Sequence, residues 1–346
     1  MTDRLKVAIL GASGYTGSEL VRLLLRHPRV ELAALTADSK AGKDMAEVFG
    51  QFAGLKLPKL VRIDELDADT FDAVFCALPH GTTQLVIRDL LARRGDLKVV
   101  DLSADFRLSD PAAYAKWYGH EHQALELQKE AVFGLTEIYR DAVRTARLVG
   151  NPGCHTTTSI LPVAPLLRAG AIDPDDIRII SATGMSGAGR AAKEAMLFSE
   201  VSEGIHAYSV TGHRHTSEFD QEYSRAAGRE VIASFTPLLV PMNRGILGTI
   251  HVAGDAATLH DVLSKTYASE PFVTVLPLGQ APQTRHVRGS NHVQIGVVGD
   301  RRPGRAIVFS VLDNLVKGAS GQAVQNLNVM MGWPETTGID QLAIFP

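Results

Sequence analysis

The chain has 346 residues, of which 45% are hydrophobic and 21% charged, enough for two domains with full cores. Its formal net charge of −3, without a basic run or an aromatic–basic patch, argues against nucleic acid as a partner. Two cysteines cannot form a disulfide framework, and the N-terminal sequence lacks a signal-peptide pattern. No segment approaches the roughly twenty unbroken apolar residues of a membrane span. We therefore expect a cytoplasmic protein without a membrane partner.

The first predicted elements are a strand at Lys6–Leu10 and a helix at Ser18–Leu25, separated by a glycine-rich turn. Strand, glycine turn and helix form the context that a dinucleotide-binding fingerprint requires. Glycines let the backbone approach a pyrophosphate, and the helix N-terminus offers N–H groups to it. The spacing is G-x-x-G-x-x-G rather than the commoner G-x-G-x-x-G, and an ordinary tight turn is the alternative. The residues expected to bind the cofactor here are Gly11, Ala12, Ser13, Gly14, Tyr15, Thr16 and Gly17.

A second strand is predicted at Val30–Leu35, and the residues that follow it bear on the choice of cofactor. Enzymes that use NAD usually place an acidic residue at this point, where it holds the ribose 2′-hydroxyl. Here Thr36 and Ser39 follow the strand, with Lys40 next to them. Hydroxyls and a lysine suit a 2′-phosphate, so we expect NADP, although Asp38 is a nearby contrary charge.

The next strand lies within Phe71–Pro79 and ends at Leu78 and Pro79. Ligands collect at the carboxyl ends of parallel strands, so these two residues are expected to face the cofactor. A further strand, Lys98–Ser103, leads to Arg107, whose planar guanidinium suits a phosphate or a carboxylate. A surface ion pair is the alternative role for this arginine.

The stretch from Asp110 to Leu135 is predicted to be a polar, irregular loop. Its histidines do not have the spacing of zinc ligands, so we expect no metal site there.

Cys154 follows a predicted buried strand, Ala146–Val149, and the turn Gly150-Asn151-Pro152-Gly153. An apolar helix is predicted from Ser159 to Leu167, with its prolines in or near the early turns. Cys154 is therefore expected in a sharp turn at a helix N-terminus, where the helix dipole favours the reactive thiolate. The alternative is a small buried hydrophobic residue, the role of most lone cysteines.

The second half of the chain begins with a predicted strand, Ile177–Ala182, and a glycine-rich loop, Thr183–Arg190. This loop is expected to open a helix at Ala191–Phe198 and to offer backbone N–H groups to a cofactor or a carboxylate. His213 and His215 come shortly before another helix. A histidine is the usual acid–base partner of a catalytic cysteine, although most single histidines are simply satisfied polar residues.

Alternating apolar residues then predict a largely antiparallel or mixed sheet, and such a sheet offers a surface for a homo-oligomer. Its strands are predicted at 231–236, 249–253, 292–298 and 306–311, and a long helix is predicted from Asp313 to Met331. The fold class is therefore α/β: a Rossmann-type parallel domain, formed by residues 1–150 with 314–346, and an α+β catalytic and dimerisation domain, residues 151–313.

Several motifs occur together and in order along nearly the whole chain. They are Gly11-Ala-Ser-Gly-Tyr-Thr-Gly17, Ala77-Leu-Pro-His-Gly81, Asp101-Leu-Ser-Ala-Asp-Phe-Arg107, Pro152-Gly-Cys154, Ser186-Gly-Ala-Gly-Arg190, His213-Arg-His215 and Asp313-Asn-Leu-Val-Lys-Gly318. In the order and spacing of these motifs, the sequence resembles the N-acetyl-γ-glutamyl-phosphate reductase family of arginine biosynthesis. The related aspartate-semialdehyde dehydrogenases carry Asn directly before the cysteine, where this chain has Gly153. The family often has Tyr at the position of His155, a difference that we expect not to affect the chemistry.

The resemblance implies an NADPH-dependent reduction of a small-molecule acyl phosphate through a cysteine thioester. It assigns Cys154 as the nucleophile and His215 as the acid–base residue, with His213 as the fallback. The Cys154 backbone N–H is expected to stabilise the oxyanion. The resemblance also implies that the chain forms a homo-oligomer, either a dimer or a tetramer, and that it binds no metal. Further cofactor-binding residues are Ser186, Gly187 and Asn314, and the substrate-binding residues are Arg107, Asn151, His213 and Arg190, with Arg214 and Arg244 as weaker candidates.

Two alternatives stay open. One is the lysine-pathway homologue that reduces an amino-adipyl phosphate, one methylene longer; a methylene in a pocket is worth only about 1–3 kcal/mol. The other is an NADP-binding regulator that keeps the fold and lacks turnover. A regulator needs neither Cys154 nor His215, so the presence of both favours an enzyme.

Overall fold

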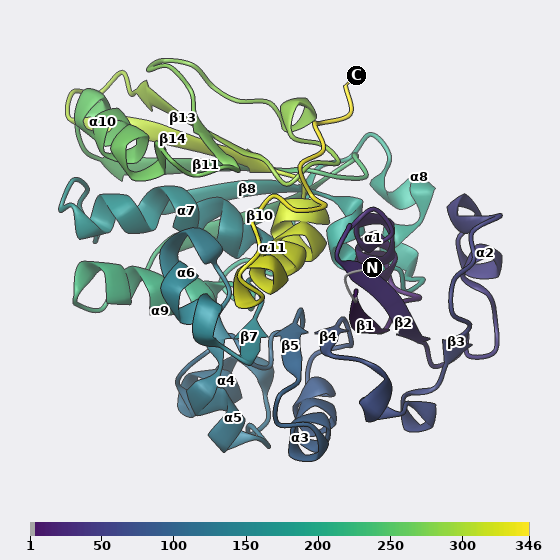
Figure 1. Cartoon of the computed structure of the whole chain (residues 1–346). Coiled ribbons are helices and arrows are strands. Elements are labelled where there is room, and N and C mark those ends of the chain that lie inside the picture. The colour runs from purple at the N-terminus through teal and green to yellow at the C-terminus, as the bar shows by residue number, and fades with distance from the viewer. Residues whose placement is uncertain (1–3, 346) are drawn as a thin grey trace. The chain divides into compact units, whose positions relative to one another are not determined.

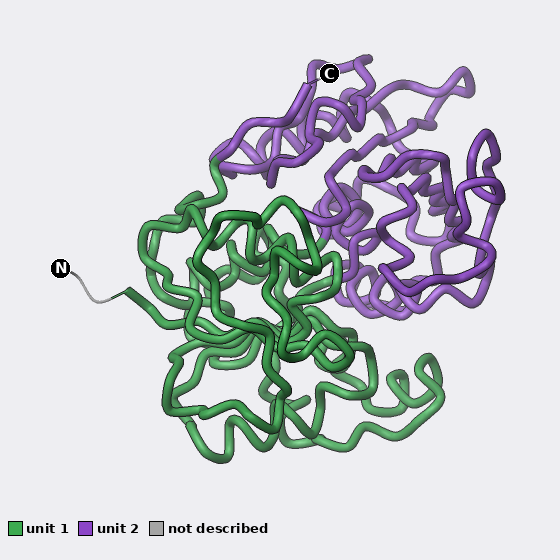
Figure 2. The backbone as a smooth tube through the Cα atoms, turned by 90° about the vertical axis from the view of Figure 1, so that its right-hand side faces the viewer, with its two compact units in different colours: residues 1–152, 319–340 green, residues 153–318, 341–346 purple. Residues whose placement is uncertain are grey.

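A computed structural model describes residues 4–345, and these form two compact units (Figure 2). Unit 1 combines the described residues up to Pro152 with Ala319–Asp340. Unit 2 combines Gly153–Gly318 with residues 341–345. The sequence-based boundary between residues 313 and 314 thus differs from the structural one, because the segment 314–318 belongs to unit 2.

The strands of unit 1 form a parallel sheet in the order β3-β2-β1-β4-β5-β7-β6. They are β1 (Leu5–Leu10), β2 (Val30–Thr36), β3 (Leu60–Val61), β4 (Ala73–Cys76), β5 (Lys98–Asp101), β6 (Val132–Phe133) and β7 (Leu148–Gly150). Strand β1 lies between β2 and β4, so the order reverses on its two sides. Such a reversal is the topological switch point at which dinucleotides bind, and the predicted Rossmann-type sheet is confirmed.

Helices cover this sheet and fill the rest of unit 1 (Figure 1). They are α1 (Tyr15–Leu24), α2 (Met45–Val48), α3 (Thr83–Arg93), α4 (Pro111–Tyr118), α5 (Leu125–Glu130), α6 (Thr136–Thr145) and α11 (Gly321–Met330), with 3₁₀ turns at Gly50–Phe52, Ile63–Glu65 and Ala68–Thr70. Helix α1 forms because its apolar residues recur at helical spacing, and Leu20, Val21 and Leu24 are buried on its inner face.

The prediction of an irregular loop over Asp110–Leu135 is wrong, because α4 and α5 occupy this stretch. The signals for α4 are local: the Asp110 carboxylate accepts a hydrogen bond from the Ala112 N–H at 2.9 Å, and Pro111 stands in the first turn. Gly119, with φ of 79°, ends the helix in the left-handed conformation. The polar composition of the stretch hid these caps.

The predicted helix from Asp313 to Met331 is shorter than expected. Strand β14 continues to Leu312, a π-helical turn follows at Val316–Ser320, and α11 starts only at Gly321. Helix α11 is buried on all sides and packs against α6 and β5. One of its buried amides, Asn326, donates from Nδ2 to the Gly134 carbonyl at 2.8 Å.

Unit 2 contains a mixed sheet in the order β12-β13-β14-β11-β8-β10-β9, as predicted. The strands are β8 (Arg178–Gly184), β9 (His206–Ala207), β10 (Ser234–Val240), β11 (Ile246–Ala253), β12 (Val273–Val275), β13 (Val293–Gly299) and β14 (Arg305–Leu312). The pairs β8–β10 and β12–β13 are parallel, and the other pairs are antiparallel. Alternate residues of β11 are buried, which is typical of a sheet with one covered face.

Helices α7 (Cys154–Arg168) and α10 (Ala256–Tyr267) pack on the covered face, and α9 (Thr216–Ala227) packs against α7 (Figure 1). The predicted helix at Ala191–Phe198 is wrong: this stretch contains a 3₁₀ turn, Glu194–Met196, and α8 begins only at Phe198 and runs to Val201. Further 3₁₀ turns lie at Met185–Ala188 and Thr284–His286. No helix within residues 4–345 is both long enough and apolar enough to cross a membrane.

The prolines of α7 lie in its interior, at 162 and 165, and not near its start as the sequence suggested. Pro165 has no N–H for the Leu161 carbonyl, which would otherwise lose its helical partner. The hydroxyl of Tyr267 in α10 donates to this carbonyl. Packing between α7 and α10 therefore replaces the missing backbone hydrogen bond.

Candidate active site

Cys154 is the first residue of α7, and its side chain is half-buried. The residue before it, Gly153, is the N-cap in an extended conformation, with φ of −70° and ψ of 154°. The Gly153 carbonyl accepts the Thr157 N–H at 2.9 Å, which closes the first turn of the helix. The sulfur thus stands at the positive end of a 15-residue helix, where a thiolate is favoured.

The ring of His215 lies directly against Gly153. A Cβ atom on Gly153 would stand 2.3 Å from His215 Nε2 and 2.6 Å from two ring carbons. His215 immediately precedes α9 and is its N-cap. Any side chain at position 153 would displace the histidine, so the glycine brings this ring beside the residue that precedes the cysteine.

A second glycine packs on the cysteine itself. A Cβ atom on Gly318 would stand 2.8 Å from the Cβ of Cys154. The Gly318 N–H donates to the Asp313 carbonyl at 2.9 Å, which holds this turn in place. The motif from Asp313 to Gly318 is thus part of the cysteine site.

Glu218 is a residue of this site that sequence reasoning missed. It lies in the first turn of α9, is completely buried, and accepts the Gly153 N–H through Oε2 at 3.0 Å. A helix N-terminus stabilises a carboxylate at this position. The signal was present in the sequence as an acidic residue in the first turn of the helix that follows His215.

His155 forms the centre of an aromatic cluster beside the cysteine. Its Nδ1 lies 2.7 Å from the Ser181 hydroxyl and its Nε2 lies 2.9 Å from the Tyr208 hydroxyl. The His155 ring centroid is 5.3 Å from that of His213 and 5.6 Å from that of His215. Burial, with a smaller contribution from His213, lowers the pKa of His155 to about 3. His155 is therefore neutral and supports the two other rings.

His213 accepts a hydrogen bond from the backbone of its neighbour in the same motif. The His215 N–H donates to His213 Nδ1 at 3.1 Å, so a neutral His213 carries its proton on Nε2. Burial, together with the nearby charge of Arg214, lowers the pKa of His213 to about 4. A ring that is neutral and already accepts a backbone N–H suits a positioning role, and this favours His215 for proton transfer.

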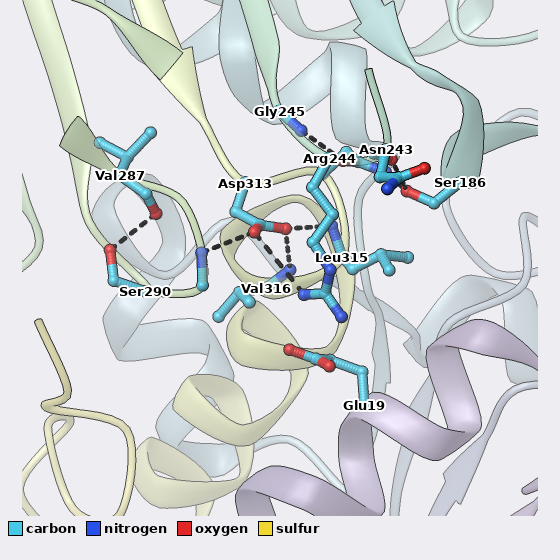
Figure 3. Close-up of polar contacts among 12 residues, drawn as sticks. Glu19, Ser186, Asn243, Arg244, Gly245, Val287, Ser290, Asp313, Leu315 and Val316 are labelled. Atoms are coloured by element: carbon cyan, nitrogen blue, oxygen red, sulfur yellow. Dashed lines mark hydrogen bonds and ion pairs between the residues drawn. The ribbon is translucent and has the colours of Figure 1, made fainter. Parts of the chain in front are cut away.

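The glycine-rich loop that begins at the end of β8 is joined to the turn after β14 (Figure 3). The Asn314 amide donates to the Ser186 hydroxyl at 2.9 Å, and its oxygen accepts the Gly245 N–H at 2.8 Å. Ser186 in turn donates from its hydroxyl to the Asn243 carbonyl at 2.6 Å. A Cβ atom on Gly187 would lie 3.8 Å from the Asn314 amide nitrogen. Three predicted cofactor-binding residues, Ser186, Gly187 and Asn314, thus lie together.

Asp313, the first residue of a motif noted in the sequence but given no role there, anchors the same turn (Figure 3). Its carboxylate is completely buried and accepts the N–H groups of Leu315 at 2.8 Å and Gly289 at 2.7 Å. The Arg244 guanidinium lies 3.6 Å from the same carboxylate. Arg190, by contrast, lies on the exposed surface of its loop.

In unit 1, two glycines of the glycine-rich turn pack closely against their neighbours, and a third leaves space for a ligand. Gly11 has φ of +82°, and a Cβ there would stand 2.5 Å from the Ala77 carbonyl oxygen. A Cβ on Gly17 would stand 2.3 Å from the Gly11 oxygen, whereas a Cβ on Gly14 would be no closer than 3.5 Å to another residue. Gly11 therefore packs the turn against the residues that follow β4, Gly17 lets α1 pack closely on the turn, and the face of Gly14 is open to a ligand. This arrangement fits a pyrophosphate.

Leu78 borders this turn, since the same hypothetical Cβ on Gly11 would lie 3.4 Å from its side chain. Leu78 is half-buried and Pro79 is exposed, just beyond the carboxyl end of β4. Both follow a strand next to the switch point, as the sequence predicts for residues that face the cofactor.

Thr36 is hydrogen-bonded to the glycine turn. It is completely buried, and its hydroxyl accepts the Gly11 N–H at 3.1 Å. Ser39 is exposed. A basic residue that the sequence did not indicate, Arg62, reaches this region and lies 3.5 Å from the Asp38 carboxylate. It follows β3, whose two residues are too few to give a recognisable strand pattern.

Arg107 and Asn151 are both buried in unit 1. Arg107 donates to the backbone carbonyls of Asn151, at 2.7 Å, and of Leu102, at 3.0 Å. The Asn151 amide donates to the Ala319 carbonyl at 3.1 Å, and its oxygen accepts from Asn326 at 3.1 Å. These contacts fix both side chains, and the Asn151 backbone orients Arg107.

A parallel sheet with an open glycine turn at its switch point, combined with a cysteine at a helix N-terminus beside a histidine, has the features of a nicotinamide-dependent dehydrogenase. Within the described part of the chain, no group of three or more His, Cys, Asp or Glu side chains is arranged to hold a metal ion.

Comparison with known proteins agrees with this class. Residues 6–146 match the family "Semialdehyde dehydrogenase, NAD binding domain", and residues 154–314 match "Semialdehyde dehydrogenase, dimerisation domain". An N-acetyl-gamma-glutamyl-phosphate reductase of Afipia carboxidovorans is 64% identical over 350 residues, which cover 99% of each chain. The protein of the same name from Rhodospirillum rubrum is 62% identical and aligns over the full length of both chains.

The fold also matches a solved structure of aspartate semialdehyde dehydrogenase II from Vibrio cholerae. The TM-score is 0.72 over 96% of this chain and 99% of that one, at 18% sequence identity. The chain therefore belongs to the semialdehyde dehydrogenase family and, within it, to the N-acetyl-gamma-glutamyl-phosphate reductases.

Proposed function

We propose that this chain reduces N-acetyl-γ-glutamyl phosphate to N-acetylglutamate 5-semialdehyde with NADPH, a step of arginine biosynthesis. The names of relatives up to 64% identical supply the substrate. The observation that carries the chemistry is the position of Cys154 at the start of α7, with the His215 ring packed on the preceding glycine.

In the first step, the Cys154 thiolate attacks the acyl carbon of the substrate. A carbon–sulfur bond forms, the bond from that carbon to the phosphate oxygen breaks, and inorganic phosphate leaves with the electron pair. The Cys154 backbone N–H, at the helix N-terminus, is proposed to stabilise the oxyanion of the tetrahedral intermediate. The product of this step is a thioester on Cys154.

A bound nicotinamide cofactor supplies hydride to the thioester carbonyl. The residues proposed to hold its pyrophosphate are those of the turn from Gly11 to Gly17. When the resulting tetrahedral oxyanion collapses, the aldehyde leaves and the Cys154 thiolate is regenerated.

His215 is proposed to take the Cys154 thiol proton before attack and to return a proton when the thiolate or oxyanion departs. Its ring lies beside Gly153, and Glu218 holds the Gly153 N–H on the same turn. Arg107 is proposed to receive the phosphate, because its guanidinium can bind oxyanions in a bidentate manner. His213 and Arg190 are proposed to contact the substrate.

The proposed cofactor is NADP rather than NAD. Ser39 is exposed beyond β2, and Arg62 lies close to the same turn through Asp38. A hydroxyl and a guanidinium favour a 2′-phosphate. Thr36 acts on the cofactor indirectly, because its hydroxyl accepts the Gly11 N–H under the turn.

We also propose that the chain forms a homo-oligomer through the second sheet. The matched family is described as a dimerisation domain. On the face of this sheet opposite α7, Ile180 is 39% exposed, and Leu247 and Phe309 are only half-buried. Molar-mass measurement by light scattering tests this proposal: a dimer or tetramer supports it, and a monomer at micromolar concentration contradicts it.

The test of the function is the reverse reaction. Purified protein is mixed with NADP, inorganic phosphate and N-acetylglutamate semialdehyde, and the absorbance of NADPH is followed. We expect NADPH to appear only when all three are present. The semialdehyde that is one methylene longer serves as a control, because faster turnover of that compound would indicate the lysine-pathway reaction. Failure to reduce NADP with either aldehyde would support the non-catalytic regulator instead.

A further inference from the structure

A chain of buried polar groups lies in unit 1, at the carboxyl end of β5. Asp101 Oδ2 lies 2.6 Å from the Ser103 hydroxyl oxygen, which lies 2.8 Å from that of Thr83. The Thr83 hydroxyl oxygen in turn lies 2.7 Å from Asp105 Oδ2. All four residues are buried, with at most 1% of each exposed.

The three oxygen–oxygen contacts of this chain each require a hydrogen atom, because all three are as short as O–H···O hydrogen bonds. The Ser103 and Thr83 hydroxyls supply one hydrogen each. If both carboxyl groups were ionised, one contact would bring two lone pairs together without a hydrogen. A third proton must therefore reside on one of the two carboxyl groups.

Asp105 is not the carboxyl group that carries this proton, because it is surrounded by donors. It accepts the backbone N–H groups of Gly81, at 2.8 Å, and Thr83, at 3.2 Å. Its Oδ1 also lies 2.8 Å from the Tyr114 hydroxyl. Burial opposes ionisation, but the hydrogen bonds from Thr83, Gly81 and Tyr114 hold the pKa of Asp105 below its ordinary value.

The direction of the Tyr114 hydrogen bond is fixed by its other neighbours. The Gln123 N–H donates to the Gln84 side-chain oxygen at 2.5 Å, which sets the orientation of the amide. The Gln84 nitrogen then donates to the Tyr114 oxygen at 2.7 Å. The Tyr114 hydrogen is left for Asp105 Oδ1, and Oδ2 accepts the N–H groups of Gly81 at 3.0 Å and Thr83 at 3.2 Å, so Asp105 is the carboxylate.

We propose that Asp101 is a neutral carboxylic acid in the folded protein and that its proton sets a one-way chain of hydrogen bonds from Asp101 through Ser103 and Thr83 to Asp105. Asp101 Oδ2 then donates to Ser103, while Oδ1 accepts the Ser103 N–H at 3.0 Å. Ser103 completes its coordination by accepting the Asp105 N–H at 3.0 Å.

The surroundings of Asp101 agree with a neutral group. Burial, with a contribution from Asp105, raises the pKa of Asp101 to about 7, although hydrogen bonds from Ser103 and the charge of Arg107 act in the opposite direction. Cys76 faces it from β4, and burial raises the pKa of that thiol well above its ordinary value, so this neighbour is neutral too. The sequences of β7 and α11, which also pack against β5, contain no ionisable residue.

Asp101 is accordingly a positioning residue for the turn that follows β4. The chain concentrates one negative charge on Asp105, which holds the N–H groups of Gly81 and Thr83. Gly81 has φ of +81°, a conformation that glycine adopts readily, and Asp105 holds its N–H in this turn. Ionisation of Asp101 would remove one hydrogen from the chain and add a second buried charge.

Isotope-edited infrared spectroscopy with ¹³C-labelled aspartate tests the proposal at pH 6. We expect the wild-type protein to show a carboxylic acid C=O band that Asp101→Asn removes. Asparagine reproduces the protonated acid, since its oxygen can accept the Ser103 N–H and its NH₂ can donate to the Ser103 hydroxyl. Absence of the band in the wild type, its persistence in Asp101→Asn, or failure of Asp101→Asn to fold would overturn the proposal.

Urea unfolding provides a second test with a definite sign. Between the unfolded aspartate pKa of about 3.9 and the folded value, the folded state keeps a proton that the unfolded state has released. As pH rises from about 4 to about 7, the ratio of unfolded to folded wild-type protein should therefore increase by up to about tenfold per pH unit. This increase is measured relative to the same ratio for Asp101→Asn. Trp117 and Trp333 both belong to unit 1, so their fluorescence reports its unfolding.

Asp105→Asn is the matched control, because it changes the other end of the chain. Its amide nitrogen would meet groups that donate to Asp105, so we expect a large shift toward the unfolded state at every pH. Two outcomes would contradict the assignment of the proton to Asp101. One is an equal pH dependence of unfolding in the wild type and Asp101→Asn, and the other is a stable Asp105→Asn protein beside an unstable Asp101→Asn protein.

Discussion

Position 153 shows how a single missing side chain can arrange a reactive centre. In this chain the His215 ring occupies the space that a side chain at position 153 would need. Gly153 also donates its N–H to Glu218. The glycine therefore fixes where the histidine lies relative to the start of α7.

Replacing Gly153 with Ala is expected to lower kcat by about 10²-fold, the loss that a displacement of roughly 1 Å can cause. The added methyl group must push the His215 ring away, since it would stand 2.3 Å from Nε2. Gly212→Ala, in the loop that carries the two histidines, is the matched control because a Cβ there meets open space. Steady-state kinetics of both variants measure the effect, and equal activity would show that the ring position is unimportant.

His215→Asn is expected to reduce kcat by roughly 10²–10⁴, the usual size of general acid–base catalysis. It should also flatten the acid limb of the kcat/KM profile, because that limb reports the general base of the free enzyme. His213 remains neutral until pH falls to about 4, so His213→Asn should mainly raise KM and leave that limb in place. If His213→Asn abolishes the acid limb while His215→Asn retains it, the two roles are reversed.

Helix α7 illustrates how neighbouring elements compensate for each other. Its sequence contains two interior prolines, yet it runs for 15 residues and is buried along most of its length. The Leu161 carbonyl, which Pro165 leaves without a helical donor, receives the Tyr267 hydroxyl from α10. The two helices are therefore joined by a hydrogen bond that the proline made necessary.

Tyr267→Phe should lower the free energy of unfolding by about 1–3 kcal/mol, because a buried carbonyl loses its partner. In a Pro165→Ala background the new N–H can serve Leu161, so the same substitution should cost less. Urea unfolding of the wild type, the two single variants and the double variant completes a double-mutant cycle. An identical cost of Tyr267→Phe in both backgrounds would rule out this compensation.

The elements that could be predicted from the sequence are those with strong local patterns. The strand, glycine turn and helix at the N-terminus, and the alternation of β11 and β14, are properties of short segments. The prolines of α7 were predicted near its start and not in its interior, because the compensating residue, Tyr267, is distant in sequence. The caps of α4 were missed because the polar composition concealed the helix. Glu218 and Asp313 were missed for a similar reason: their partners, Gly153 and Gly289, lie far away in the chain.

At the scale of the whole molecule, the chain divides into a nucleotide-binding unit and a unit that contains Cys154. The residues proposed to select between NADPH and NADH, Ser39 and Arg62, belong to unit 1. We expect kcat/KM to be higher with NADPH than with NADH. Ser39→Glu should reverse or abolish this preference, because a carboxylate repels a 2′-phosphate and can accept the ribose hydroxyl of NADH. Lys56→Glu, a charge change at an exposed position on the same unit, is the control. A preference of the wild type for NADH would refute the proposed role of Ser39 and Arg62.

The central claim is that Cys154 carries the acyl group between loss of phosphate and reduction. Mass spectrometry of the protein after mixing with N-acetyl-γ-glutamyl phosphate, without NADPH, tests it most directly. We predict one N-acetylglutamyl group per chain, mapped to the peptide that contains Cys154 and discharged when NADPH is added. Cys154→Ala should show no adduct and should lose turnover, whereas Cys76→Ala, which changes a buried thiol in β4, should retain the adduct. An adduct on another residue, or Cys154→Ala activity within about tenfold of the wild type, would contradict the mechanism.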